Sequence, residues 1–370
     1  MRKLLLGTAA VAMGLAMSAP ANAQVSLDLG GHFKGYVTWV DQDTDATTDE
    51  RSLDILRETE IHFTGETTLD NGLTVGFHAE ADVDDGEFAQ DESYLYMSGT
   101  WGRVNFGSED GAAYLMQVAA PSADSNIDGI RQYVQPVNYS LTTFGIANAA
   151  LVTAINAEGF DYDNDLSGDN DKITYMTPVF NGFQAGVSYT PDAGNTTGSR
   201  SLNGVNRDDQ NDTFGEAYEG AVRYEGQFEE VGFALGAGYT HVENEKDNNT
   251  GVDDFQEWNV GLDMDWGAFG IGVVYTENNN GRDTNDENET WVVGADYTTG
   301  PYKLGVSWYN NETDVVAANT IETDRFSGGV VYTYGPGMTF RGSLGYVEHD
   351  ITGAADVEAT YALIGTQVNF

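Results

Sequence analysis

Apolar and polar residues alternate along almost the whole chain, which is the period of a β-strand with one buried face and not the period of a helix. In the first such segment Leu27, Phe33 and Trp39 fall on one face, whereas His32 and Lys34 fall on the other. The apolar face often has an aromatic residue at one or both ends, with glycines or aliphatic residues between. We count 16 segments of this kind, which start near Leu27, Ile55, Leu73, Glu92, Gly102, Lys172, Phe183, Glu216, Val231, Phe255, Gly267, Thr290, Tyr302, Arg325, Met338 and Val357.

Short and long connections alternate between these segments. The short ones, at 69–72, 180–182, 299–301 and 335–337, contain Asn-Gly or Gly-Pro, the chemistry of tight hairpin turns. The long ones, at 41–52, 191–213, 243–254, 278–289 and 310–322, are rich in acidic residues. An up-and-down barrel has this asymmetry when its two rims face different compartments.

The pattern therefore predicts an all-β protein, an antiparallel transmembrane β-barrel of 16 strands. Residues 108–171 form the longest connection, and a further hairpin around 137–150 would raise the number to 18, which is also even, as in single-chain bacterial barrels. A soluble sandwich or propeller also alternates apolar and polar residues. Here, however, the polar face is crowded with charges, the apolar face ends in aromatic residues, and the sequence has no repeat of blade length.

Residues 1–23 have the features of a secretory signal peptide. Arg2 and Lys3 precede an apolar stretch at 4–17, and residues 21–23 (Ala-Asn-Ala) form a typical cleavage site. Cleavage there would leave a barrel domain of residues 24–370. No later segment offers the roughly 20 consecutive apolar residues of a transmembrane helix, so a place in the membrane requires a closed barrel.

The chain is strongly acidic, with 59 Asp and Glu residues against 16 Lys and Arg residues and a formal charge of -43. This balance argues against nucleic-acid binding, because the carboxylates would repel a phosphate backbone. Without cysteine, disulfides and thiolate metal sites are excluded. Acids crowd the long connections, for example at 41–50 and 161–171, where they would give one mouth of the barrel a negative potential that enriches cations.

We predict no cofactor. Divalent cations such as calcium suit the acidic loops, but 161–171 lacks the glycine at the sixth position of an EF-hand loop, and the sequence identifies no metal-binding residues.

The few basic residues of the predicted strands nearly all lie on the polar face. A charge that faces lipid near the bilayer centre costs roughly 2–4 kcal/mol, whereas a water-filled lumen accepts it. The residues with this lumen parity are Lys34, Arg103, Lys172, Arg223, Lys303, Arg325 and Arg341. Arg57 is the exception, because it shares the parity of Ile55 and Phe63; a bulge, a subunit contact or a rim position would each explain it.

Residues 93–109 form a tyrosine-bearing strand, a very short turn and a second strand that contains Gly102, Val104 and Gly107, followed by the long acidic connection. Residues 366–370, which end in Phe370, look like a last strand with a terminal aromatic residue. In these features, and in the order and number of its segments, the chain after residue 23 resembles the general diffusion porins of Gram-negative outer membranes.

The resemblance implies a homotrimer of 16-stranded barrels in the outer membrane, in contact with lipopolysaccharide, each barrel with its own pore. The third external loop, about 108–171 here, would fold into the lumen and narrow it. The residues implied for the constriction are the loop acids Glu109, Asp110, Asp124 and Asp128 and the wall residues Lys34, Arg103 and Lys172. Residues 112–116 would form a short helical turn that packs the loop on the wall, and Phe370 would be read by the barrel-insertion machinery.

We therefore predict a passive, water-filled outer-membrane channel for small hydrophilic solutes and ions that prefers cations, and not an enzyme. None of the five histidines sits in a sequence motif with a serine, a second histidine or a carboxylate at ligand spacing. The alternatives are a substrate-selective porin for sugars, an outer-membrane enzyme and an adhesin barrel. A sugar channel needs an aromatic track, for which Tyr36, Tyr309 and Tyr361 have lumen parity, although rim positions would also explain them.

Overall fold

The computed structural model describes residues 25–44, 50–83, 88–141, 160–194, 214–245, 253–282, 287–316 and 319–370. The predicted signal peptide lies outside these residues, and so does most of the segment 137–150 in which the sequence allows a further hairpin. Among the described residues, no helix is long and apolar enough to cross a membrane.

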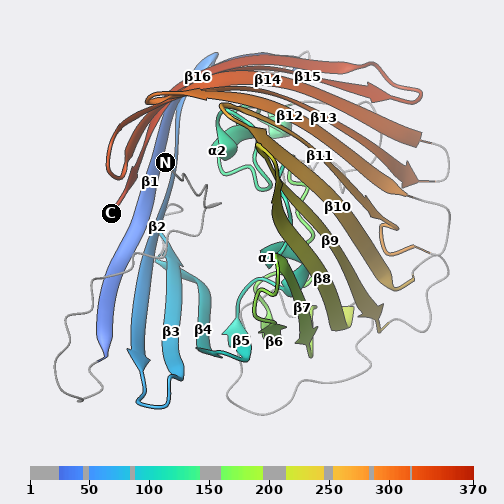
Figure 1. Cartoon of the computed structure of the whole chain (residues 1–370). Coiled ribbons are helices and arrows are strands. Elements are labelled where there is room, and N and C mark those ends of the chain that lie inside the picture. Colours follow the sequence, from blue (N-terminus) through green and yellow to red (C-terminus); the bar gives the residue numbers. More distant parts are fainter. Residues whose placement is uncertain are drawn as a thin grey trace.

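Sixteen antiparallel strands form one closed barrel (Figure 1). Each strand pairs with its neighbours in the sequence, and β16 pairs with β1 to close the ring. The strands are β1 (Ser26–Gln42), β2 (Leu53–Thr68), β3 (Thr74–Asp82), β4 (Ala89–Gly99), β5 (Gly102–Ser108), β6 (Asp171–Met176), β7 (Phe183–Thr190), β8 (Phe214–Phe228), β9 (Val231–Asn244), β10 (Phe255–Trp266), β11 (Phe269–Asn278), β12 (Asn288–Thr299), β13 (Tyr302–Val316), β14 (Asn319–Gly335), β15 (Met338–Ile351) and β16 (Val357–Asn369). The predicted 16-stranded barrel is confirmed. Because β5 pairs directly with β6, the long segment between them adds no strands to the ring, and the 18-stranded alternative is excluded.

The tight turns fix the register of the hairpins that they connect. At the predicted Asn-Gly turn between β2 and β3, Gly72 has a φ of +82°, which a residue with a side chain rarely adopts. Thr68 therefore pairs with Thr74, and the same register brings His62 opposite Glu80 further along the strands. A one-residue slip would move every side chain to the other face of the wall, so this register also determines what faces the lumen.

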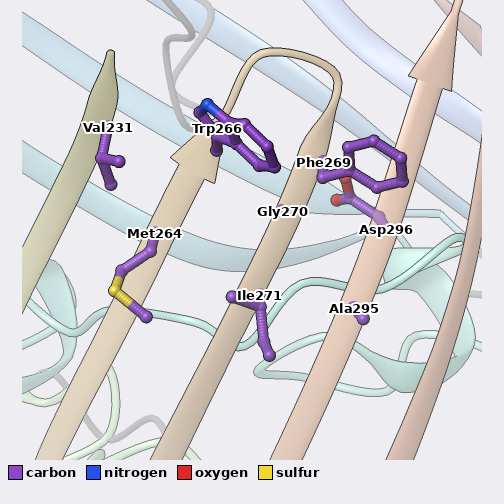
Figure 2. Close-up of a pocket in the computed structure, with 8 residues that line it drawn as sticks. All are labelled: Val231, Met264, Trp266, Phe269, Gly270, Ile271, Ala295 and Asp296. Atoms are coloured by element: carbon purple, nitrogen blue, oxygen red, sulfur yellow. The ribbon is translucent and has the colours of Figure 1, made fainter. Parts of the chain in front are cut away.

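The outer wall is apolar and exposed. Figure 2 shows a part of it on β9 to β12, where side chains that include Met264, Trp266 and Phe269 line an apolar depression. Trp266 and Phe269 lie where β10 ends and β11 begins, as in the aromatic girdles of membrane barrels. Ile364 on β16 is 76 % exposed. An apolar surface that continues around the strands is suited to lipid and not to water.

The buried core lies inside the ring. The segment between β5 and β6 carries two short helices, α1 (Ala112–Leu115) and α2 (Ser125–Asp128), and a 3₁₀ turn at Tyr139–Leu141. Figure 1 shows both helices within the barrel. Apolar side chains of this segment, such as Ile127 and Phe160, pack with wall residues such as Tyr361 in one buried cluster. The loop is therefore part of the folded interior of the barrel.

Candidate pore constriction

A row of glycines on the inner wall lets the loop lie directly on the sheet. A Cβ atom at Gly294 would lie 1.8 Å from the carbonyl oxygen of Pro121, and one at Gly305 would lie 2.4 Å from the nitrogen of Ala123. The glycines that face loop residues 112–123 in this way are Gly186, Gly236, Gly238, Gly261, Gly272, Gly294, Gly305 and Gly329. They run across β7 and β9 to β14, so the loop follows one side of the lumen.

The first anchor of the loop is α1, which confirms the short helical turn expected at 112–116. The N–H of Ala112 donates to Ser188 Oγ at 2.7 Å, and the N–H of Ala113 donates to Glu219 Oε2 at 3.0 Å. These bonds satisfy two of the amide groups that the first turn of a helix leaves without partners. Ser167 Oγ donates to the other oxygen of Glu219 at 2.5 Å and joins the returning part of the loop to the same wall residue.

Arg131 holds the acidic parts of the loop together. Its Nε donates to Asp163 at 2.8 Å, its terminal nitrogen donates to Asp110 at 2.9 Å, and Asp165 binds the same nitrogen. The guanidinium also lies over the ring of Tyr114, 4.3 Å from its centroid. The acidic run at 161–171 is therefore used in part to bind an arginine of the same loop.

Glu109 and Asp110 leave the wall directly after β5 and are buried. Burial raises the pKa of the Glu109 carboxyl to about 8, while Arg103 and Lys172 oppose the change. Burial also raises the pKa of Asp110 to about 7, against the attraction of Arg131. The side chain of Asn105 donates to Glu109 at 2.5 Å, and Lys172 Nζ donates to the Glu109 carbonyl oxygen at 2.5 Å.

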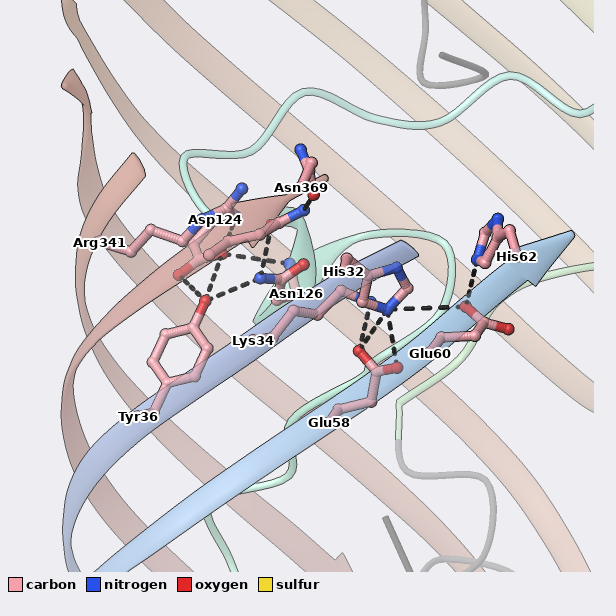
Figure 3. Close-up of polar contacts among 11 residues, drawn as sticks. His32, Lys34, Tyr36, Glu58, Glu60, His62, Asp124, Asn126, Arg341 and Asn369 are labelled. Atoms are coloured by element: carbon pink, nitrogen blue, oxygen red, sulfur yellow. Dashed lines mark hydrogen bonds and ion pairs between the residues drawn. The ribbon is translucent and has the colours of Figure 1, made fainter. Parts of the chain in front are cut away.

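The other two loop acids bind the opposite part of the wall. Asp124 receives bonds from Arg341 at 2.5 Å and from Tyr36 Oη at 2.9 Å, as Figure 3 shows. Asp128 accepts bonds from Ser307 at 2.8 Å and from Ser327 at 2.9 Å. Both carboxylates are buried. They fix α2 against β13, β14, β15 and β1.

The basic residues predicted for the lumen divide into two groups. Lys34, Lys172 and Arg325 are buried beneath or beside the loop, and Arg325 donates to the carbonyl oxygen of Ile127 at 3.1 Å. The remaining four keep some contact with solvent, and they are Arg103, Arg223, Lys303 and Arg341.

The pairing thus differs from the one that the resemblance implies. Asp124 binds Arg341 directly, and Asp110 binds an arginine of its own loop, whereas both were expected to face Lys34, Arg103 and Lys172. Arg57 is exposed on the outer wall, opposite Gly35 of β1.

Two features of the lumen were not predicted from the sequence. The first is Arg131, which lies in the long connection, where the sequence has no periodic pattern that would predict its position. The second feature is a row of histidines and glutamates on β1, β2 and β3, made of His32, Glu58, Glu60, His62, His78 and Glu80. No linear motif joins these residues. The Asn-Gly turn could have revealed the His62–Glu80 part of the row, because it determines the β2–β3 register.

Comparisons with known proteins agree with this architecture. A family model described as Gram-negative porin matches residues 7–352. An anion-selective porin from Comamonas acidovorans is 16 % identical, with a TM-score of 0.64 over 94 % of this chain and 100 % of that chain. A variant of the porin of Rh. blastica is 20 % identical, with a TM-score of 0.55 over 93 % of this chain and 100 % of that chain.

Among curated sequences, an uncharacterised protein of Rickettsia conorii is 30 % identical over 118 residues, which are 30 % of this chain and 27 % of that protein. The chain thus matches about a quarter of the length of this relative. The family model, in contrast, covers nearly the whole chain, and the structural neighbours share its barrel. The chain belongs to the Gram-negative porin family, whose members are non-enzymatic channels of the outer membrane.

Proposed function

We propose that this porin is a passive, water-filled channel for small hydrophilic solutes and ions, and that it prefers cations. The observation that carries the proposal is a loop held on one side of a closed barrel by the glycine row and by buried polar bonds. A barrel of 16 strands is wide enough for an aqueous channel. In the lumen, side chains such as His62 and Glu80 keep part of their surface exposed.

The distribution of charge supports the preference for cations. The loop covers Lys34, Lys172 and Arg325, so these cations contribute little to the surface that a passing ion meets. Near the rim with the short turns, three carboxylates lie close to one ammonium group. Asp265 and Asp296 flank Gly270, and Asp263 lies beside them. The ammonium is that of Lys303, whose Nζ lies 3.1 Å from Asp296. A lumen lined in this way attracts cations and repels anions. The anion selectivity named for the Comamonas porin is a property of that protein.

A sugar-selective channel is the second candidate, and the tyrosines argue against it. Tyr36, Tyr309 and Tyr361 are buried in the cluster between loop and wall. They therefore do not offer a solute the exposed aromatic track that a sugar channel needs.

Single-channel current of the purified protein in a planar bilayer under a salt gradient tests the function. We expect large, voltage-independent steps with a cation-selective reversal potential. The double variant Asp263→Asn/Asp265→Asn should lower the cation selectivity, whereas Asp70→Asn, in an exposed turn, should not. Block by one sugar would favour the selective channel. Absence of conductance from folded protein would refute the proposal and reopen the enzyme and adhesin alternatives.

We also propose that the chain forms a homotrimer through the outer face of β1 to β4. This sector carries Arg57, whose charge is unfavourable against lipid. Gly35 stands opposite Arg57, Thr59 lies next to it on the same face, and exposed apolar side chains such as Val37 and Ile55 surround them, as in a contact between subunits. A subunit contact would remove Arg57 from lipid. Light scattering of the protein in detergent should give three chains per particle, and Arg57→Asp should lower the temperature at which they separate.

The outer wall also suggests how the barrel meets lipopolysaccharide. Across β11 to β15, carboxylates stand directly opposite one another in the pairs Glu277–Glu289, Glu289–Glu312, Glu312–Glu322 and Glu322–Asp350. On β11 and β12 they lie one step beyond the aromatic residues Tyr275 and Trp291, and Tyr275 Oη donates to Glu277 at 2.7 Å. Opposed like charges destabilise a sheet. We propose that divalent cations such as calcium bridge this row to lipopolysaccharide phosphates.

Two steps of biogenesis complete the proposal. Residues 1–23 would be removed on export. Phe370, which is exposed and pairs through its backbone with Gly31 at 3.1 Å, would be read by the barrel-insertion machinery.

A further inference from the structure

Three imidazoles and three carboxylates form a continuous row on the lumen face of β1, β2 and β3, next to the constriction loop. Figure 3 shows the part of the row that contains His32, Glu58, Glu60 and His62. The register places His32 opposite Glu60 and His62 opposite Glu80. The imidazole rings of His32 and His62 lie 5.9 Å apart, and those of His62 and His78 lie 5.6 Å apart. Nothing in the channel function proposed above requires this row.

We propose that His32 Nε2, Glu60 Oε2 and His62 Nε2 form a binding site for a divalent transition-metal ion of the zinc class. One ligand atom from each of these residues lies within 4.8 Å of the other two. Glu60 Oε2 is 3.6 Å from His32 Nε2 and 3.2 Å from His62 Nε2. Ligands about 2.0–2.1 Å from a tetrahedral zinc ion are about 3.3 Å from each other. Imidazole and carboxylate together are a donor set that suits zinc.

The second nitrogen of His62 has the partner that a metal-bound histidine needs. Nδ1 of His62 lies 3.3 Å from Glu80 Oε1, on the side of the ring away from Glu60. Histidines that bind a metal usually donate their other N–H to a carboxylate, which fixes the tautomer and orients the ring. Glu80 is itself held by His78 Nε2 at 2.6 Å, and His78 Nδ1 is 2.8 Å from Thr64 Oγ1. Glu80 is thus a positioning residue for His62.

Among the described residues, His62 Nε2 is shielded from water, and its contact with Glu60 at 3.2 Å is an ion pair that lacks hydrogen-bond geometry. His32 Nε2 lies 2.8 Å from both oxygens of Glu58, so an ion bound to His32 would have Glu58 within reach as a further ligand. A small rotation of His32 and Glu58 toward Glu60 would bring four donors around one centre. Water could fill any remaining position.

The charge of the row favours a divalent cation. The ammonium of Lys34, 2.6 Å from Glu58, balances that carboxylate, and Glu60 remains as the negative group between the two imidazoles. Asp82 and Asp91 face the same region from β3 and β4 and add further carboxylates. A Zn²⁺ ion would neutralise this excess of acidic groups. The row faces the lumen with side chains 14 % to 29 % exposed, so an ion can reach it from the channel water.

Zinc titration of the folded, metal-free protein in detergent, followed by calorimetry, tests the site. We expect one Zn²⁺ per chain, and Co²⁺ in its place should give the strong visible absorption of a four- or five-coordinate ion. His62→Ala and His32→Ala should each abolish this stoichiometric binding. Glu80→Gln should weaken the affinity about 10-fold or more, because it removes only the group that orients His62.

The matched control is His241→Ala, because His241 lies on β9, where Asp254 at 3.6 Å is its one ion-pair partner within the part of the chain that the structure describes. It should leave zinc binding unchanged. Each variant is first shown to be folded by its heat-modifiable mobility in gels. Equal zinc binding by the wild type and folded His62→Ala would refute the site. The measurement reads binding and not conductance, so it can fail while the channel function stands.

Discussion

Arg131 shows how one residue can determine the shape of the pore. It is the cation at the centre of a group of three carboxylates, the buried Asp110 and the half-buried Asp163 and Asp165. A buried ion pair adds little net stability, but loss of one partner is costly because it leaves the other charges without compensation. The loop is therefore more sensitive to the loss of Arg131 than to the loss of a surface arginine.

Replacement of Arg131 by alanine should loosen the loop without opening the barrel. We expect the docked loop to lose about 3 kcal/mol, the cost of breaking a buried ion pair. Limited proteolysis should then cut the loop faster, while the unheated barrel still migrates as folded in gels. Arg51→Ala, at an exposed position between β1 and β2, is the control and should behave as wild type. Equal cleavage rates for the two variants would contradict the role given to Arg131.

The raised pKa values of Glu109 and Asp110 make the docked loop depend on pH. Both carboxyls hold their protons more tightly when the loop is docked, with pKa values of about 8 and about 7. Docking is therefore favoured most at low pH, below the ordinary range of free carboxyls, and the stabilisation is lost as the pH rises through 7 to 8.

We expect the loop to become more accessible to protease as the pH rises from about 4 to about 8, and the cation selectivity to rise as the two carboxyls ionise. Glu109→Gln should remove about half of the change, because the Asp110 carboxyl, whose pKa is raised by a similar amount, still titrates. Asp70→Asn, in an exposed turn at the short rim, should leave it intact. If the rate of proteolysis of the wild type does not change over this pH range, neither carboxyl titrates there.

At the scale of elements, contact between loop and sheet depends on glycines that carry no side chain. On β12 and β13, Gly294 and Gly305 leave room for the backbone of Pro121 and Ala123. Larger residues there would push the loop toward the centre of the lumen. The glycine row thus sets the distance between the loop and the wall, and with it the width of the channel.

Gly294→Val is expected to displace the loop and to change the single-channel conductance. Forcing a side chain into a filled contact costs about 1–3 kcal/mol, and the loop can relieve that cost by leaving the wall. The control is Gly220→Val on β8, because nothing lies within 4 Å of a Cβ atom at Gly220. If both variants conduct like the wild type, the glycine row does not determine the pore.

At the scale of the whole molecule, the barrel presents two different outer sectors. One sector, on β1 to β4, carries Arg57 within an apolar surface, and the other, on β11 to β15, carries the row of opposed carboxylates. The two sectors fit two different neighbours, a second copy of the chain and an anionic lipid that is bridged by cations.

Removal of divalent cations should therefore destabilise the wild-type barrel in lipopolysaccharide. We expect EDTA to lower its thermal midpoint, because the opposed glutamates are then left without bridging ions. In Glu312→Gln/Glu322→Gln the shift should be smaller, and Glu229→Gln/Glu230→Gln, in a short turn, should respond like the wild type. An EDTA effect of equal size in all three proteins would place the cations elsewhere.

The sequence by itself determined the barrel. Its period of two assigns each strand residue to one face, and burial at the membrane makes that assignment strict, so Phe326 and Phe340 are exposed outside while Arg325 and Arg341 point inward. The Asn-Gly and Gly-Pro turns separate the strands, and 16 strands with an in-folded loop follow from the same pattern and the family resemblance.

Only the tertiary structure decided the contacts within the lumen. Asp124 reaches Arg341, and Asp110 reaches Arg131, because the loop follows the glycine row, and no period in the loop sequence reports that path. His32 meets Glu60 across a long connection, whose length leaves the register open, whereas the tight turn at Gly72 already fixes His62 opposite Glu80. Local alternation specifies the wall, but the pore depends on contacts between residues that are distant in the chain.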